Sequence, residues 1–424
     1  MARADNITEH WMSTRRNAAE LRKALFGAKL TDLMDQRDIT VQALARQVPC
    51  DKAQLSRYRT GQHLPSATIV ARLDDLLGAG GELVALTRRE ALTNAGAIAP
   101  LAIMPGSLLG LLGESAARVT THHRIDDVGV DALANLLAAY RAADDSLGSL
   151  AVLAAARSQL TDIERLVTTT SGPTRTALLD VAQQWSQFAA WLCRDSGDLA
   201  GAHVLQLQTL EWATEIDDRT MMGTILVERG YAALQSDSVR TATAAGQAAQ
   251  RHPGTASGQR AGGAQLEARA YALMGDYPAM ERTLGRADHL VELFEDHPQD
   301  RRPWAYWMSP TLFTCDRGVV LAAAAMTNPR YCAPAVTALK SGHAALPESQ
   351  RSSAWGGLYL AHLANVHAKA GDLEQSIATA LTCADIATRT GSPRLIAMLT
   401  QLNTGLARRY PGDPRVMALT EALT

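Results

Sequence analysis

The chain contains 424 residues, of which 47% are hydrophobic and 20% are charged, and its formal net charge is -2. This composition excludes a disordered chain, and the length leaves room for two or three folded domains. Residues 1–90 carry 14 Lys and Arg against 11 Asp and Glu, whereas the remainder carries 27 against 32. The five Cys residues form no CxxC pair, so the sequence indicates neither a zinc knuckle nor a disulfide framework, and we expect reduced thiols.

Helix-forming residues dominate the chain, and β-branched runs of strand length are almost absent, so we predict an all-α fold. Residues 1–17 are polar and are expected to form a flexible tail. Because residues 1–25 are charged throughout, they do not resemble a secretory signal, and we expect a cytoplasmic protein. Apolar residues at helical spacing then predict a first helix over residues 17–37, which opens a domain spanning residues 18–90.

The segment that follows combines two short helical patterns with a tight turn between them. Thr40 can cap the first helix, which carries apolar residues at helical spacing over positions 41–48. Pro49 cannot continue that helix, and Asp51 is a good N-cap for the next one. The second pattern, over residues 52–60, has only two apolar positions and leaves its basic and polar side chains free to point outward. Two helices in this relation predict a helix-turn-helix, whose second helix fits the major groove of DNA.

At residues 40–66 the sequence resembles the phage-repressor-like (XRE, Cro/CI-type) helix-turn-helix family. The match extends through GQHLPSATIVARLDDLLG, residues 61–78, which is similar to the loop and fourth helix of that family. A five-helix domain is expected, with a fourth helix after the N-cap Ser66 and a short fifth helix over residues 82–90. The resemblance implies a homodimer bound to double-stranded operator DNA. It implies base contacts from Lys52, Ala53 and Arg57, and phosphate contacts from Gln54, Arg59, Thr60 and Gln62.

Residues 91–113 contain no charge and follow Arg88-Arg89, a pattern that has two interpretations. A twin-arginine pair before an apolar stretch of membrane-spanning length is typical of a membrane or export element. The stretch is internal, however, and Asn, Pro and Gly residues interrupt it. We therefore favour a buried apolar connector over residues 91–125 and expect no membrane partner.

From residue 126 onward the chain reads as one helix after another, with a periodic feature in the joints. Gly197-Asp198, Ser236-Asp237 and Gly275-Asp276 stand 39 residues apart, and Gly371-Asp372 follows 96 residues after the third. Each joint lies between two segments of helical pattern. This arrangement predicts a stack of helical hairpins over residues 126–424, in which every unit buries its apolar face against a neighbour.

The joints GDLAGA, GDYPAM and GDLEQS resemble those of tetratricopeptide repeats, so the predicted α-solenoid is TPR-like. Together with the helix-turn-helix, the whole chain is similar to actinobacterial XRE regulators that carry a C-terminal TPR-like domain. It is more distantly similar to peptide-sensing regulators built from the same two parts. The resemblance implies that residues 126–424 serve dimerisation, either alone or together with the sensing of a small molecule or peptide.

Two groups of side chains are candidates for an effector site in this array. The first group is aromatic and lies in the early repeats, where helical spacing makes a role in the core the alternative. The second lies in residues 294–313, where three prolines interrupt the repeat rhythm. Such an insert is expected either to wall a ligand site or to be a loop packed against the stack. The members of the two groups are Trp185, Trp212, Tyr231 and Tyr271, and Arg301, Trp304, Tyr306 and Trp307.

The sequence offers no pattern that supports catalysis or a bound cofactor. His362 and His367 are five residues apart and do not share a helix face as a zinc-binding pair would. No GxSxG elbow or dinucleotide-binding loop is present. We therefore expect no enzyme activity, no cofactor and no metal. The favoured function is a sequence-specific transcriptional regulator, and the alternative is a scaffold whose helix-turn-helix and repeats contact protein partners.

Overall fold

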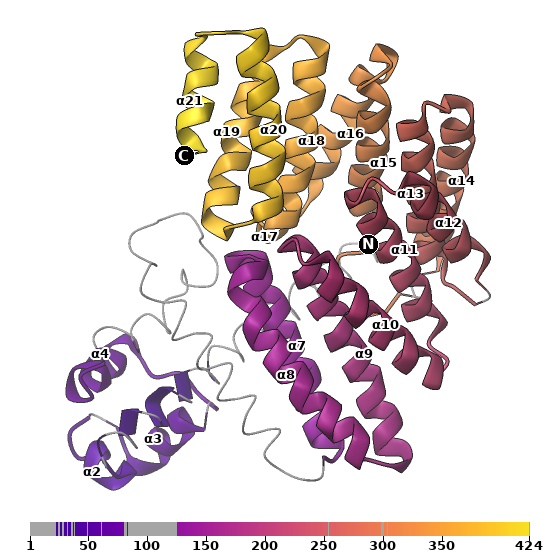
Figure 1. Cartoon of the computed structure of the whole chain (residues 1–424). Helices are drawn as coiled ribbons and strands as arrows, with labels where there is room; N and C mark the ends of the chain where they lie inside the picture. The colour runs from indigo at the N-terminus through magenta and orange to yellow at the C-terminus, as the bar shows by residue number, and fades with distance from the viewer. Residues whose placement is uncertain are drawn as a thin grey trace, which may run out of the picture. The chain divides into compact units, whose positions relative to one another are not determined.

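The computed structural model divides into two compact units, residues 1–115 and residues 116–424 (Figure 1). The structure describes residues 23, 26, 27, 29–31, 33, 34, 37, 39–48, 50–60, 62–79, 83, 125–252, 254–297, 301, 302 and 304–423. These residues form helices and no strands, which confirms the predicted all-α class. The predicted tail, nearly all of the predicted connector and all but one residue of the predicted fifth helix lie outside the described residues.

Three short helices with defined bounds lie in the N-terminal unit: α2 (Val41–Ala45), α3 (Lys52–Arg59) and α4 (Ala67–Leu76). As predicted, Thr40 caps α2, because its hydroxyl accepts a hydrogen bond from the Ala43 N–H at 3.2 Å. The helix is shorter than predicted, since residues 46–48 form a turn rather than a further helical turn. The positions of α3 and α4 agree with the prediction.

Asp51 starts α3 through a capping box. Its carboxylate accepts a hydrogen bond from the Gln54 N–H at 2.7 Å, and Gln54 Oε1 accepts one from the Asp51 N–H at 3.1 Å. Two backbone donors that a helix start leaves unsatisfied are thereby paired. The cap fixes the residue at which α3 begins and holds its first turn in place.

One apolar cluster holds these helices together. Leu55 is the one buried residue of α3 and has no exposed surface, while Tyr58 packs against the cluster partly buried. A narrow apolar stripe therefore anchors α3, and most of its remaining surface is exposed. The buried members of the cluster are Phe26, Leu30, Leu33, Met34, Leu44, Val48, Leu55, Val70, Leu73, Leu77, Ala79 and Leu83.

The C-terminal unit is an array of helices joined by short turns. Its elements are α7 (Asp127–Leu147), α8 (Ser149–Thr169), α9 (Gly172–Asp195), α10 (Leu199–Glu215), α11 (Arg219–Gln235), α12 (Val239–Arg251), α13 (Ser257–Met274), α14 (Tyr277–Asp296), α15 (Pro310–Ala325), the 3-10 helix η4 (Pro329–Tyr331), α16 (Cys332–Ala345), α17 (Glu348–Arg351), α18 (Ala354–Ala370), α19 (Leu373–Thr390), α20 (Pro393–Arg409) and α21 (Pro414–Ala422).

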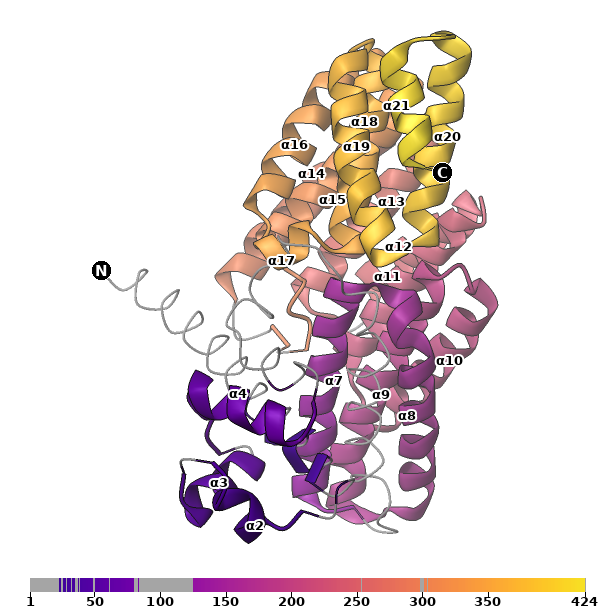
Figure 2. The same ribbon diagram turned by 90° about the vertical axis from the view of Figure 1, so that its left-hand side faces the viewer.

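Consecutive helices of the array pack as pairs, such as α9 with α10, α13 with α14 and α18 with α19. The first helix of each pair also contacts the first helix of the next pair (Figures 1 and 2). We call these first members the linked helices: α7, α9, α11, α13, α15, α18 and α20. The apolar faces are buried between neighbouring pairs, which is how an array of small units makes a continuous core.

The helix joints lie where the sequence predicts them. Asp198, Asp276 and Asp372 each cap the helix that follows, since each carboxylate accepts a hydrogen bond from the backbone N–H three residues later. Asp237 has a left-handed backbone with a φ of 55°, and Ser238 is the N-cap of α12. The Asp side chain at the other three joints satisfies a free N–H group of a helix start, whereas Ser238 makes no such side-chain hydrogen bond, so the periodic Asp marks the helix joints in the sequence.

The two ends of the array meet, because α17 and α19 both contact α7. Trp355 Nε1 donates a hydrogen bond to Asp145 Oδ1 at 2.9 Å and joins residues 210 positions apart. Close by in sequence, Gly148 has a φ of 83°, and a Cβ there would lie 2.0 Å from the Thr390 carbonyl oxygen. Only glycine fits this approach. The linked helices therefore surround an interior.

Candidate functional site

The residues predicted to contact DNA lie on α3 and the turn after it, and all are exposed. They are Lys52, Ala53, Gln54, Arg57, Arg59, Thr60 and Gln62. The helix contains no acidic residue, and Lys52, Arg57 and Arg59 make no ion pair with any residue that the structure describes. Their positive charges are therefore open to a phosphate or base partner.

Local hydrogen bonds already engage several of these side chains. Arg57 Nε donates to the Ala53 carbonyl at 3.4 Å, and the Thr60 hydroxyl donates to the Ser56 carbonyl at 3.1 Å. Gln54 uses its side-chain oxygen in the capping box, which leaves its amide N–H groups as donors. Thr60 and Gln54 are thus fixed by the helix itself, whereas the Arg57 fork keeps further donors for a partner.

The structure does not bring the predicted aromatic residues of the array into one site. Trp185 has no exposed surface, and its Nε1 donates to the Leu133 carbonyl at 3.1 Å. Trp212 is buried as well. Tyr231 donates to Asp316 at 3.4 Å, and the Tyr271 hydroxyl donates to Glu267 at 3.2 Å. Trp185 and Trp212 are part of the core, which is the alternative that their helical spacing left open.

The insert between α14 and α15 packs on the array. Trp304 is buried in a cluster with residues of α10 and α11, and Trp307 packs against that cluster. The Arg301 guanidinium stacks on the Phe294 ring at 4.5 Å. Tyr306 hydrogen-bonds to the Asp145 carboxylate, although part of its ring is exposed. The insert is thus a loop packed against the stack, and its aromatic residues are its anchors.

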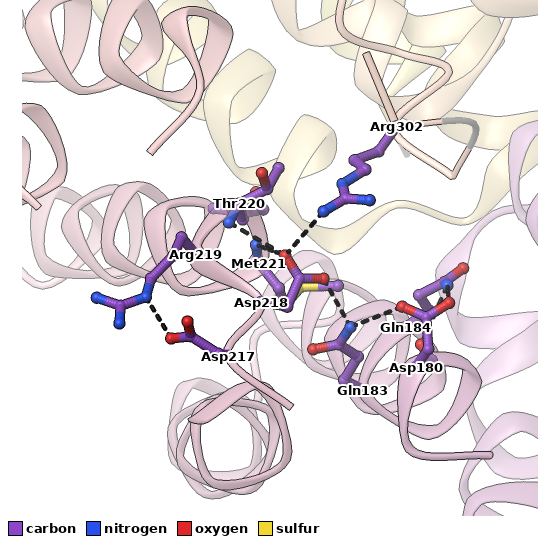
Figure 3. A network of polar contacts seen from close by, with 10 residues as sticks. Asp180, Gln183, Gln184, Asp217, Asp218, Arg219, Thr220, Met221 and Arg302 are labelled. Atoms are coloured by element: carbon purple, nitrogen blue, oxygen red, sulfur yellow. Dashed lines mark hydrogen bonds and ion pairs between the residues drawn. The ribbon is translucent and has the colours of Figure 1, made fainter. Parts of the chain in front are cut away.

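A polar network ties the insert to the joint between α10 and α11 (Figure 3). Asp218 caps α11, and its other oxygen accepts a hydrogen bond from Gln183 Nε2 at 2.8 Å. Arg302 approaches the same carboxylate at 3.8 Å, and Gln183 also donates to Asp180 at 3.1 Å. An open hollow of about 600 Å³ borders this network, lined by Pro173, Thr176, Ala177, Asp180, Ile216, Asp217, Asp218 and Arg302.

Sequence reasoning missed the ionisable side chains on the linked helices. Burial raises the pKa of Asp144 to about 7 and that of Asp145 to about 6. Burial likewise raises the pKa of Asp316 to about 6. A usable signal exists in the sequence, because the adjacent charges Arg194 and Asp195 end a helix that is otherwise apolar over its last turns. Charged side chains are rarely buried unless they form an ion pair or hydrogen bonds with each other or with a bound molecule.

The comparison with protein families identifies the N-terminal unit. Residues 25–86 match a family model described as a helix-turn-helix domain. This segment contains α2, α3 and α4 and the described core of the unit, so the predicted helix-turn-helix is confirmed. Helix-turn-helix domains bind DNA through their second helix, which here is α3. A comparison with curated proteins finds no match to the chain.

Neither a membrane-spanning helix nor a metal-binding cluster occurs among the described residues. None of their helices combines the length with the apolar character that crossing a bilayer requires. Within the same residues, His, Cys, Asp and Glu side chains form no group of three that could hold a metal ion.

Proposed function

We propose that the chain is a sequence-specific transcriptional regulator of the XRE type, which binds operator DNA as a homodimer. The α3 residues Lys52, Ala53 and Arg57 read base edges, and Gln54, Arg59, Thr60 and Gln62 hold the phosphates. The TPR-like array of residues 126–424 dimerises the chain and binds an effector. Two α3 helices then address half-sites about 34 Å apart, one turn of the DNA helix.

The exposed, cationic surface of α3 is the observation that carries this proposal. The helix is capped at its start, anchored by the buried Leu55 and the half-buried Tyr58, and free of acidic residues. A helix of this kind presents a fixed row of donors to the major groove. Three unpaired cations on it attract the DNA backbone irrespective of sequence, and an Arg fork adds preference for guanine.

Capture of genomic DNA fragments by the full-length protein tests the proposal. Wild type is compared with the double variant Lys52→Ala/Arg57→Ala and with Arg282→Ala, which removes an exposed charge from α14. We expect wild type and Arg282→Ala to enrich a sequence with paired half-sites, and the double variant to lose that enrichment. If wild type enriches no fragment at moderate salt, the scaffold function gains the support.

Single variants separate base reading from phosphate binding. Arg57→Ala is expected to cost about 1 to 3 kcal/mol at one base position. Arg59→Ala is expected to weaken binding to all sequences and to lower the slope of affinity against salt by about one ion. Equal losses on operator and random DNA for Arg57→Ala would contradict its role as a base contact.

A further inference from the structure

Several arginines on the linked helices make no hydrogen bond within the described residues; Arg141 of α7 is one of them, and three others lie within electrostatic reach of one another. Arg194 lies on α9 and is 6% exposed, Arg269 lies on α13, and Arg394 lies on α20. None of the three guanidinium groups makes a hydrogen bond or ion pair within the part of the chain that the structure describes, and Arg269 Nε is fully buried without an acceptor. A guanidinium has five N–H donors, and leaving them unpaired away from water is costly.

The acidic groups of the interior are engaged by neutral donors instead. Asp316 accepts hydrogen bonds from the Tyr359 hydroxyl at 3.0 Å and the Tyr231 hydroxyl at 3.4 Å. Asp195 accepts one from the Ser392 hydroxyl at 3.4 Å. Glu228 accepts one from Gln187 Nε2 at 2.6 Å. These carboxylates moderate the charge of the interior, but they do not occupy the arginine donors.

The three arginines converge on one region of the interior. Arg394 interacts electrostatically with both Arg194 and Arg269, and burial together with these like charges lowers its pKa to about 10. Arg269 and Arg394 both act on His362 of α18, whose pKa burial holds well below its usual value. Like charges gathered in a region of low polarity repel each other strongly. Glu228, Asp316 and Asp195 offset part of this repulsion, but among the described residues none of them forms a hydrogen bond with the three guanidinium groups.

Aromatic rings and partial exposure to solvent accompany these arginines. The Arg194 guanidinium lies over the Trp191 ring at 4.7 Å and near the Tyr231 ring at 5.8 Å, so aromatic stacking fixes its plane. Arg269, His362 and Arg394 keep partial exposure, which means that solvent-accessible space adjoins them. Planar forks held in this way recognise carboxylate and phosphate groups through paired hydrogen bonds.

We propose that Arg194, Arg269 and Arg394 form a binding site for a small, multiply charged anion with carboxylate or phosphate groups, inside the helical array. Its negative charge supplies the acceptors that the three guanidinium groups lack. This proposal rests on the proposed function in one respect: the anion would be the effector of the regulator. Binding of the anion itself requires no DNA.

Thermal unfolding and calorimetric titration of the full-length protein test the site. The probes are citrate for carboxylates and pyrophosphate for phosphates, each compared with sodium chloride at equal ionic strength. We expect at least one probe to raise the melting temperature of wild type and to bind at a single site. The probe that binds more tightly identifies the chemical group, and stabilisation by neither probe overturns the proposal.

Variants separate a ligand site from a structural role. Arg394→Met should fold and melt at the same or a higher temperature than wild type without anion, because a half-buried charge that repels Arg194 and Arg269 is removed. It should bind the probe at least tenfold more weakly, and Arg269→Gln serves as a second variant with the same expectation. Arg282→Met on the exposed face of α14 should bind as wild type does. Unchanged affinity in both interior variants would overturn the proposal.

A last control keeps the two proposals distinguishable. Lys52→Ala/Arg57→Ala should bind the anion as wild type does, since its substitutions lie in the N-terminal unit. Loss of DNA binding with intact anion binding would then concern α3 only. Normal DNA binding with no effect of either probe on stability would refute the anion site and leave the regulator standing.

Discussion

The two units of this protein differ in where they place charged side chains. The helix-turn-helix unit buries an apolar cluster and carries Lys52, Arg57 and Arg59 on its surface. The helical array places Arg194 and Asp144 among its buried residues. An arginine exposed to water needs no ion pair for the protein to be stable, and its charge is available to a large anion such as DNA. A buried arginine without hydrogen-bond acceptors lowers the stability of the folded state.

The two units therefore differ in how far their charged residues contribute to stability. Apolar packing holds the N-terminal unit, and Lys52, Arg57 and Arg59 on α3 make no ion pair with any described residue. The array combines apolar packing between helix pairs with an ionisable interior, so its stability depends on protons and on any bound anion. Three predictions test this contrast. One changes a buried carboxyl group of the array, and the other two change the apolar anchor and the N-terminal cap of α3.

The largest expected effect is a dependence of the array's stability on pH. Burial, reinforced by the nearby Asp145 and Asp195 carboxylates, raises the pKa of Asp144 from 3.8 to about 7. A carboxyl group of this kind favours the folded state fully below the unfolded pKa, and that contribution is lost as the pH rises through about 7. The shift corresponds to about 4 kcal/mol at 1.36 kcal/mol per pKa unit. The melting temperature of the array should therefore fall between about pH 4 and about pH 7 and level off above that range.

Asp144→Asn checks the origin of this effect. The amide stays neutral at every pH, so the variant should lose the part of the decline that Asp144 causes, while Asp145 and Asp316 keep theirs, and it should be more stable than wild type at about pH 8. Asp131→Asn, on the exposed face of α7, is the matched control and should keep the wild-type profile. Identical pH profiles for wild type and Asp144→Asn would show that other groups govern the dependence.

A smaller effect is expected from the apolar anchor of α3. Leu55→Ala removes a fully buried side chain and should destabilise the N-terminal unit by about 3 kcal/mol through the cavity that it leaves. Because the two units are separately compact, the unfolding transition of the array should stay in place. Calorimetry resolves the two transitions, and Val204→Ala, at a position 65% exposed on α10, is the control. A parallel drop in both transitions would contradict independent cores.

The smallest effect is expected at the cap of the same helix. Asp51→Ala removes the acceptor for the Gln54 N–H and should cost about 1 kcal/mol. Asp51→Ser keeps an acceptor and should behave nearly as wild type. Hydrogen exchange of the first amides of α3 measures the change, since an uncapped first turn opens more often. Equal exchange in Asp51→Ala and Asp51→Ser would show that the cap does not limit opening.

Local signals made much of this fold predictable. Thr40 and Asp51 cap helices through residues three positions away, and Asp198, Asp276 and Asp372 do the same in the array. A pattern that acts over three residues is visible in a sequence without knowledge of the fold. The end of α2 was less predictable, because the turn over residues 46–48 continues the same apolar spacing.

The interior could not be predicted in the same way. Tyr231 meets Asp316 across 85 positions, and Trp185 meets Leu133 across 52. Those pairings depend on which helix faces which, and periodicity within one helix does not contain that information. Arg269 and Arg394 look like ordinary surface arginines until the helix pairs are placed side by side. Trp185 and Trp212 were chosen as candidates because large apolar rings recur at helical spacing, and the same spacing places them in the core.

The contact between Asp145 and Trp355 has a consequence for how the protein is made. A ribosome delivers α7 long before α17 and α18, so the first helices of the nascent array wait for a partner 210 positions downstream. Closing so long a loop is slow and gains its favourable contacts only at the end. Until those helices arrive, we expect the charged side chains of the early helices to stay exposed to water. Packing of α7 against α17 and α18 is then the step that removes these charges from water.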